Sequence, residues 1–143
     1  MNFIINRYLK HPFYKYTILG PANIIDKPHL IIVRKITIND SVVLRIVDFF
    51  GHESFIIGNY YGFQNLLTSI NAEYIDFYCS GLDHGCLVEA GFRLKQTATE
   101  VVPDHFEPFE RRNIQLDFVY KLESKSPYSI FKGDSDQDRP NLL

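Results

Sequence analysis

A carboxylate and an imidazole follow the most apolar run of the sequence, and they are the first candidates for chemistry. The run 42–49 contains Asp48 near its end, and His52 follows two residues after the phenylalanine pair. A carboxylate that is desolvated at a strand end has its pKa raised toward neutrality, which suits a general base. Histidine is the side chain that titrates near neutral pH, so His52 is a second candidate base. The structural alternative is an Asp48 that binds loop amides and a His52 that lies exposed.

A second group of reactive side chains lies closer together in the sequence. Cys79, Asp83 and His84 have the types of a nucleophile, an orienting acid and a base. Asp83 is also placed to cap a helix, and capping alone explains such close spacing. The His, Cys and Asp residues do not follow zinc-ligand spacing, so we expect no metal site.

The elements that would position these residues begin with a helix and three strands. Residues 2–9 are amphipathic and end before His11-Pro12, because a residue before proline is pushed out of the helical region. Strands are predicted at 14–19, 30–38 and 42–49. Asn39-Asp40 is a hairpin signal between the last two. The nearly continuous apolar run 42–49 predicts a central strand buried on both faces.

A crossover-like pattern follows this hairpin. Residues 51–62 are predicted to form a loop and 63–70 a short helix. The stretch 72–92 is read as a strand at 74–78, a helix from Asp83 to about Ala90, and a new strand opening at Phe92 after Gly91. Such a compact strand–helix–strand unit places ligand sites at strand ends.

The last part of the chain is predicted to hold a polar connection, a final strand at 114–122 and a polar tail. The element order is then α-β-β-β-α-β-α-β-β, an α+β fold with a mixed, mainly antiparallel sheet flanked by helices. We assign residues 1–122 to one domain and residues 123–143 to the tail.

The composition fits one ordinary globular domain. The chain has 143 residues, 45% of them hydrophobic and 22% charged, with a net charge of −2. This charge argues against nucleic acid as a partner, and no apolar run is long enough to span a bilayer. Two cysteines and a poor signal-peptide pattern predict a cytoplasmic protein.

The order of elements and several motifs resemble the acetyl-CoA-dependent N-acetyltransferase superfamily, the GNAT fold, from its second helix to its last strand. The motifs are RIVDFFG, AEYIDF and EAGF. Together with HPFYKY near the start and DQDRPN near the end, they are similar to GNAT-like proteins of bacterial surface-polysaccharide gene clusters. The resemblance implies an acyl transfer from acetyl-CoA, as co-substrate, to a small-molecule amine, such as an amino sugar.

The resemblance also implies roles for individual residues. Asp48 would be the base, at a place where the family often keeps an acidic one. Tyr78 or Cys79 could substitute for the missing acid, although neither stands at the family's position. Backbone amides around Val47, Asp48 and Phe49 would meet the thioester carbonyl. The cofactor pyrophosphate would lie at the start of the helix, near Gly58, Asn59, Gly62 and Phe63.

Three departures from the family pattern keep an alternative open. Leu87 occupies the place where the family often has a tyrosine acid, and the usual first strand and helices do not precede Pro12. In the phosphate loop, bulky residues 59–61 stand between the two glycines. We therefore expect the back part of a longer protein, a minimal variant or one half of an assembly. The alternative function is a non-catalytic GNAT-like binding or interaction module, paired with a second copy or a second domain.

Overall fold

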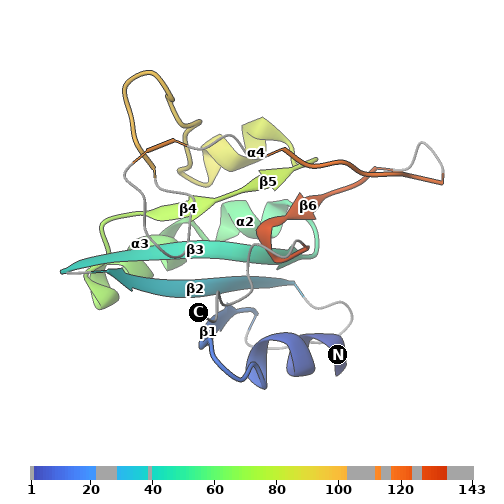
Figure 1. The fold of residues 1–143 in the computed structure, drawn as a ribbon, viewed down its shortest axis with the longest axis horizontal. Coiled ribbons are helices and arrows are strands. Elements are labelled where there is room, and N and C mark those ends of the chain that lie inside the picture. The colour runs from blue at the N-terminus through green and yellow to red at the C-terminus, as the bar shows by residue number, and fades with distance from the viewer. Residues whose placement is uncertain are drawn as a thin grey trace.

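A mixed four-stranded sheet forms the centre of the molecule (Figure 1). The computed structural model describes residues 2–21, 29–38, 40–102, 112–113, 117–123 and 127–134. The first three strands pair antiparallel, and β4 runs parallel to β3. The α+β class and the mainly antiparallel sheet predicted from sequence are confirmed. The sheet order is β1-β2-β3-β4, and the strands are Tyr16–Leu19, Leu30–Ile38, Ser41–Phe50 and Ile75–Phe77.

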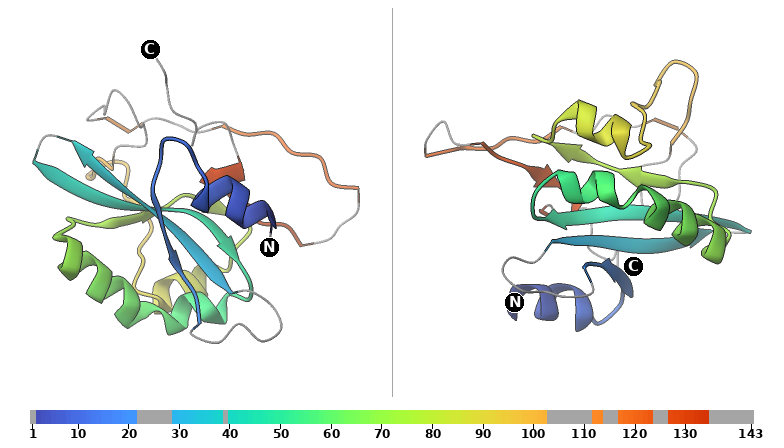
Figure 2. Two further views of the ribbon diagram at one scale, coloured as in Figure 1. Left: turned by 90° about the horizontal axis from the view of Figure 1, so that it is seen from below. Right: turned by 180° about the vertical axis from the view of Figure 1, so that it is seen from behind.

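Helices cover both faces of this sheet (Figure 2). On one face lies the N-terminal helix, in which α1 (Asn2–Ile4) continues into the π-helical turn η1 (Ile5–Leu9). On the other face lie α2 (Ser54–Gly58), α3 (Tyr60–Ile70) and α4 (His84–Glu89). Each face therefore has its own apolar cluster, with Ile4 and Tyr8 in the first and Ile56, Phe63 and Ala90 in the second.

The antiparallel hairpin of β2 and β3 is the most buried part of the chain. Residues 43–49 of β3 are all buried, because β3 lies between β2 and β4 and is covered on both faces. The prediction of a central, doubly buried strand is confirmed. The predicted helix at 2–9 and the strands at 14–19, 30–38 and 74–78 are confirmed as well, with ends that differ by a residue or two.

One ion pair is enclosed between β3 and β4. Arg45 and Asp76 are direct neighbours in the parallel register, and Arg45 Nε lies 2.7 Å from Asp76 Oδ1. The Arg45 side chain is fully buried and that of Asp76 is 6% exposed. Breaking such a pair leaves an uncompensated buried charge, so Asp76 is a structural carboxylate here.

The loop predicted at 51–62 is wrong, because most of this segment is helical. The backbone N–H groups of Ser54 and Phe55 donate to Nδ1 and the carbonyl of His52, at 3.2 and 2.9 Å, and this turn starts α2. Ile56 is then buried in the apolar cluster under the sheet. Burial of the apolar run 55–57 overrides the turn signal of the flanking glycines.

The strand predicted to open at Phe92 is also wrong. Asp83 caps α4 as predicted, accepting from Cys86 N–H at 2.9 Å, and Gly91 takes φ 89°. The Phe92 N–H, however, donates to the carbonyl of Leu87 at 3.0 Å. This bond closes the end of α4 and removes the donor that a sheet ladder would need. The Phe92 ring packs on Phe63 instead.

The final strand lies later than the prediction at 114–122. Residues 117–122 belong to no strand, and residues 114–116 lie outside the described residues. A two-stranded sheet forms instead between β5 (Cys79–Ser80) and β6 (Ile130–Phe131), and a 3-10 turn, η2 (Lys132–Asp134), follows. Residues 130–134 thus join the fold, although their polar neighbours placed them in the tail.

Candidate functional site

A β-bulge at Val47 decides where Asp48 points. Ile32 pairs with Asp48 and Val33 pairs with Ile46, so Val47 is the extra residue of β3. Regular alternation would place Asp48 on the face of Leu44 and Ile46. The bulge moves the Asp48 side chain to the opposite face, where Tyr8 of the N-terminal helix lies.

Asp48 is buried and both of its carboxylate oxygens accept hydrogen bonds. The Tyr8 hydroxyl donates to Oδ2, and the Phe49 N–H donates to Oδ1 at 2.8 Å. Arg7 Nε donates to the Tyr8 oxygen at 3.2 Å, which extends the network toward solvent. Burial raises the pKa of Asp48 to about 6, against the opposing effect of the Tyr8 hydrogen bond. A carboxylate with this pKa accepts protons near neutral pH.

Residues 130–134, which we call the C-terminal insert, lie between β3 and β5 (Figure 1). The parallel pairing of β3 with β4 ends at Ile46 and Phe77, and β5 then pairs with β6 instead of β3. Phe131 is buried, and its ring stacks on Phe77 with centroids 5.7 Å apart. The insert therefore fills the space that opens where the two strands separate.

Gly133 brings the insert into direct contact with the bulge. A Cβ on Gly133 would lie 2.7 Å from the Val47 carbonyl oxygen and 2.9 Å from the Tyr8 hydroxyl. Asp134 Oδ2 accepts from the Phe131 N–H at 2.8 Å, which closes the turn, and its charge contributes to the raised pKa of Asp48. Only a glycine fits this position without a shift of the surrounding atoms.

A buried cation of the insert meets the predicted acid, Tyr78. Lys132 is 4% exposed, and its Nζ lies 4.7 Å from the centroid of the Tyr78 ring. The Arg45 guanidinium lies 5.5 Å from the same ring. The Tyr78 hydroxyl donates to the Val102 carbonyl at 3.4 Å, on the side of β4 that faces away from β3. Its ring thus borders the insert, whereas its hydroxyl points away from Asp48.

His52 lies in the turn that precedes α2. Its side chain is exposed, and its Nδ1 lies 2.9 Å from Ser54 Oγ at the start of α2. Next to it, the Glu53 carboxylate accepts from the Asp83 N–H at 3.0 Å and links α2 to α4. His52 thus stabilises the start of α2 and Glu53 links α2 to the start of α4. In the described part of the chain, the donors to Asp48 are Tyr8 and Phe49, and not His52.

The predicted pyrophosphate residues lie at the junction of α2 and α3. Asn59 Nδ2 donates to the Phe55 carbonyl at 2.7 Å, and the Phe63 N–H donates to the Asn59 carbonyl at 2.9 Å. Phe63 itself is buried. Gly58 and Gly62 are helical residues here, so the segment is a helix pair and not an open glycine loop.

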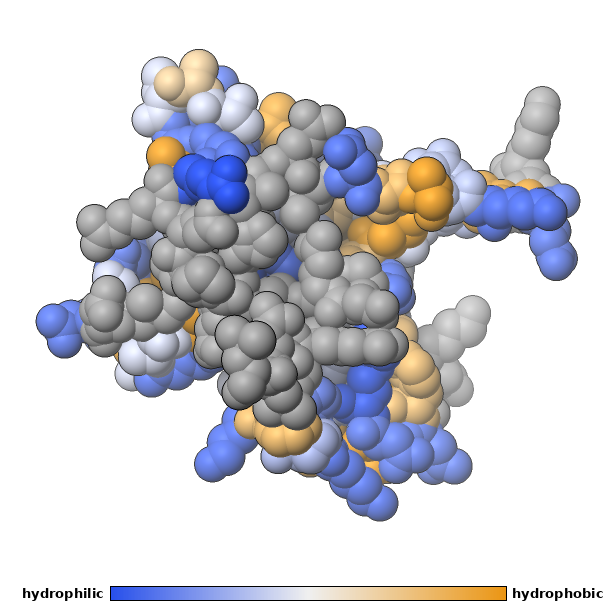
Figure 3. Space-filling view, viewed as in Figure 1, coloured by the Kyte–Doolittle hydropathy of each residue, from blue (hydrophilic) through white to orange (hydrophobic). Residues whose placement is uncertain are grey.

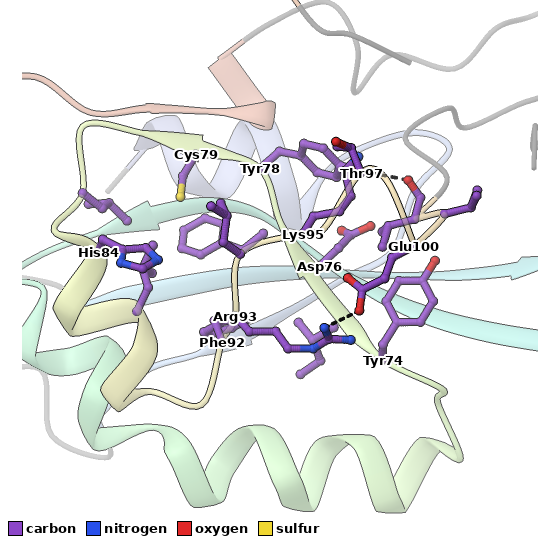
Figure 4. A pocket seen from close by; sticks show the side chains of 17 residues that line it. Tyr74, Asp76, Tyr78, Cys79, His84, Phe92, Arg93, Lys95, Thr97 and Glu100 are labelled. Atoms are coloured by element: carbon purple, nitrogen blue, oxygen red, sulfur yellow. Dashed lines mark hydrogen bonds and ion pairs between the residues drawn. The ribbon is translucent and has the colours of Figure 1, made fainter. Parts of the chain in front are cut away.

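The Cys79, Asp83 and His84 group is not organised as a nucleophile with its base. Cys79 and His84 line one pocket (Figure 4), but the Asp83 carboxylate is used to cap α4. Burial raises the pKa of the Cys79 thiol to about 11. The thiol stays protonated at neutral pH, which makes it a weak nucleophile. Leu87 lines the same pocket, away from Asp48.

Three residues around Asp48 were missed by the sequence analysis. Tyr8 sits four residues after Ile4 on the apolar face of the predicted helix, and that spacing was its signal. Lys132 and Asp134 follow Ile130-Phe131, two strand-forming residues in front of a glycine. This strand-and-turn pattern was hidden in a stretch of polar residues.

Comparisons with known proteins found no match to this chain among family models, curated proteins or solved structures. The resemblance to the acetyltransferase superfamily therefore stays a prediction from its motifs. Among the described helices, none combines the length and the apolar character that crossing a bilayer requires.

The close approach of Gly133 to Val47 predicts that a side chain at position 133 destabilises the fold. Gly133→Ala should lower the free energy of unfolding by about 1–3 kcal/mol, because the new methyl group meets backbone at Val47. Gly58→Ala is the matched control, since a Cβ there meets none of the described atoms within 4 Å. Urea unfolding of both variants checks this. Equal stability of the two variants would show that the insert does not lie against β3.

The Tyr8 hydrogen bond predicts how the pKa of Asp48 changes when Tyr8 is replaced. In Tyr8→Phe, the pKa of Asp48 should rise above about 6, because the bond that stabilises the carboxylate is lost. A pH titration followed by carboxyl carbon NMR measures this value. Tyr61→Phe, at an exposed position, is the control and should leave it unchanged. A constant or lower pKa in Tyr8→Phe would contradict the network.

Proposed function

We propose that this chain acts as an acyl-CoA-dependent N-acyltransferase, with acetyl-CoA as co-substrate and Asp48 as general base. One observation carries the proposal: a bulged central strand holds a buried carboxyl, with a pKa of about 6, beside the place where the parallel pairing of β3 with β4 ends. The motif resemblance implies an acyl thioester at this place. The acceptor class, an amine such as that of an amino sugar, rests on that resemblance alone.

Acyl transfer needs a base for the amine proton and a donor that polarises the thioester carbonyl, and the site offers a candidate for each. The acceptor nitrogen attacks the thioester carbonyl carbon, and its proton passes to Asp48 directly or through a water. The C–S bond then breaks, and CoA leaves as a thiolate that takes up a proton from water. A carboxyl with a pKa of about 6 is ionised at pH 7 and still basic enough to take this proton. Val47 stands outside the regular strand pairing, so its surroundings are the natural place for an amide that polarises the carbonyl.

The C-terminal insert sets a condition on this function. Gly133 lies against Val47 and Asp48, so a thioester reaches Asp48 only when the insert moves away from β3. Phe131 is buried and β6 is bonded to β5, which makes such a movement costly. The enzyme proposal therefore includes a displacement of residues 130–134 on cofactor binding.

The same insert favours a second candidate, a non-catalytic binding or interaction module. Both oxygens of Asp48 already have donors, and the Tyr78 hydroxyl points away from it. In this alternative, the bulge and the carboxyl hold the insert in place and no acyl group enters. The two candidates differ in whether coenzyme A binds at all.

Calorimetric titration separates the two candidates. Acetyl-CoA and free CoA, titrated into the full chain up to millimolar concentration, should both bind if the chain is an acyltransferase. Gly133→Ala, whose insert is destabilised, should bind at least as tightly as the unchanged chain. Absence of binding by both proteins at millimolar ligand would leave the non-catalytic module as the function.

Asp48→Asn tests the assigned base. Turnover of acetyl-CoA with glucosamine, followed by release of the free thiol, should fall by about 10²- to 10⁴-fold in this variant while CoA affinity stays unchanged. In the unchanged chain the rate should rise with pH through about 6, because only the ionised carboxylate accepts a proton.

His52→Gln is the control for this measurement, since His52 has no bond to Asp48 and lies exposed. Its turnover should equal that of the unchanged chain. A large loss in His52→Gln with little change in Asp48→Asn would reverse the two assignments.

A further inference from the structure

The outer edge of β4 borders a groove that is large enough for another strand. The groove has a volume of about 760 Å³ and runs along Tyr74–Cys79, with residues 92–102 as its opposite wall (Figure 4). Its apolar lining comes from Ile75 and Phe77 of β4 and from Leu82, Leu87 and Phe92 around α4. The groove is distinct from the place between β3 and β5 where Asp48 lies.

The backbone of β4 offers hydrogen-bonding groups to this groove. Leu44 N–H donates to the Tyr74 carbonyl at 3.0 Å, and Leu44 stands opposite Ile75 in the parallel register. In such a ladder the N–H and C=O groups of Ile75 and Phe77 point to the other edge. No strand among the described residues pairs with β4 there. An open edge of this kind is a template for a further strand.

Residues 117–123 and 127–129 form an arm that extends away from the body (Figure 1), and hydrophobic side chains line part of it (Figure 3). Val119 is 99% exposed, and Phe118, Tyr120 and Leu122 are all exposed as well. The limbs of the arm touch through the rings of Tyr120 and Tyr128, with centroids 4.6 Å apart. Four large apolar side chains in one short exposed segment mark an interaction surface.

The arm and the groove are complementary in pleat. On a strand through 117–122, Phe118, Tyr120 and Leu122 share one face. Beside β4 that face would extend the apolar side formed by Ile75 and Phe77.

We propose that the chain forms a two-fold dimer in which the arm of each copy pairs with the β4 edge of the other. The returning limb of the arm runs directly into β6, where Ile130 pairs with Ser80. The arm therefore extends away from the body of its own chain (Figure 1). A second copy presents the same groove, so reciprocal exchange buries both arms and closes both open edges.

Two exposed positions test the proposal. The unchanged chain should be a dimer by size-exclusion chromatography with light scattering at micromolar concentration. Val119→Pro removes a strand donor and should give a monomer, as should Leu94→Asp, which places a charge in the groove. Leu9→Asp is the matched control, because Leu9 is an exposed apolar residue outside both surfaces, and it should remain dimeric.

Mixing the two variants gives the decisive result. Val119→Pro keeps an intact groove and Leu94→Asp keeps an intact arm, so the mixture should recover a dimer that neither variant forms alone. Circular dichroism equal to that of the unchanged chain shows that each variant is folded. An unchanged chain that is monomeric at all concentrations would overturn the proposal. So would a dimer that both variants retain, or a mixture that stays monomeric.

Discussion

The bulge in β3 is the constraint on which the rest of the structure depends. β3 buries both of its faces, and a regular strand would aim the Asp48 carboxylate into the apolar layer under α3. Burying an ionised group without partners costs several kcal/mol. One extra residue, Val47, turns the carboxyl to the other face, where Tyr8 is available as a donor. The hydrogen bond from Tyr8 and the close approach of Gly133 both meet the strand at this change of register.

The polar groups around the bulge come from parts of the chain that are far apart in sequence. Tyr8 and Arg7 come from the first helix, Asp48 from the central strand, and Asp134 from the C-terminal insert. A buried polar group rarely tolerates the loss of one partner, because the remaining partners are left unsatisfied. Asp48 thus lies where the first helix, the central strand and the C-terminal insert meet. A change in its protonation or bonding therefore also changes the packing of these three segments.

The sequence was a good guide where one local rule decided the structure. The apolar run at 42–49, the hairpin beside it and the cap at Asp83 each depend on a pattern within a few residues, and all are found. Prediction failed at Ile56, where burial in the core overrode the local turn signal. It also failed at Phe92, where the N–H closes the end of α4 and the ring packs on Phe63, so that no strand opens.

The candidate site shows the same limit. Asp48 was found from its place at the end of an apolar run, and His52 was chosen by residue type alone. The structure instead uses the backbone and ring of His52 to start a helix. The bulge, the separation of β3 from β5 and the filling of that space by residues 130–134 are properties of pairing between strands. No pattern within a single strand encodes these features, so they could not be predicted from the sequence.

The insert has a consequence for how the protein is made. Chains fold as they are synthesised, and contacts between distant residues form late. The β2–β3 hairpin and its covering helices are complete in the growing chain long before Phe131 and Gly133 exist. Until then the apolar surfaces of Phe49 and Phe77 have no cover from Phe131. The nascent protein therefore passes through a stage that displays aromatic rings, and in that stage chaperones would find a surface that the finished fold conceals.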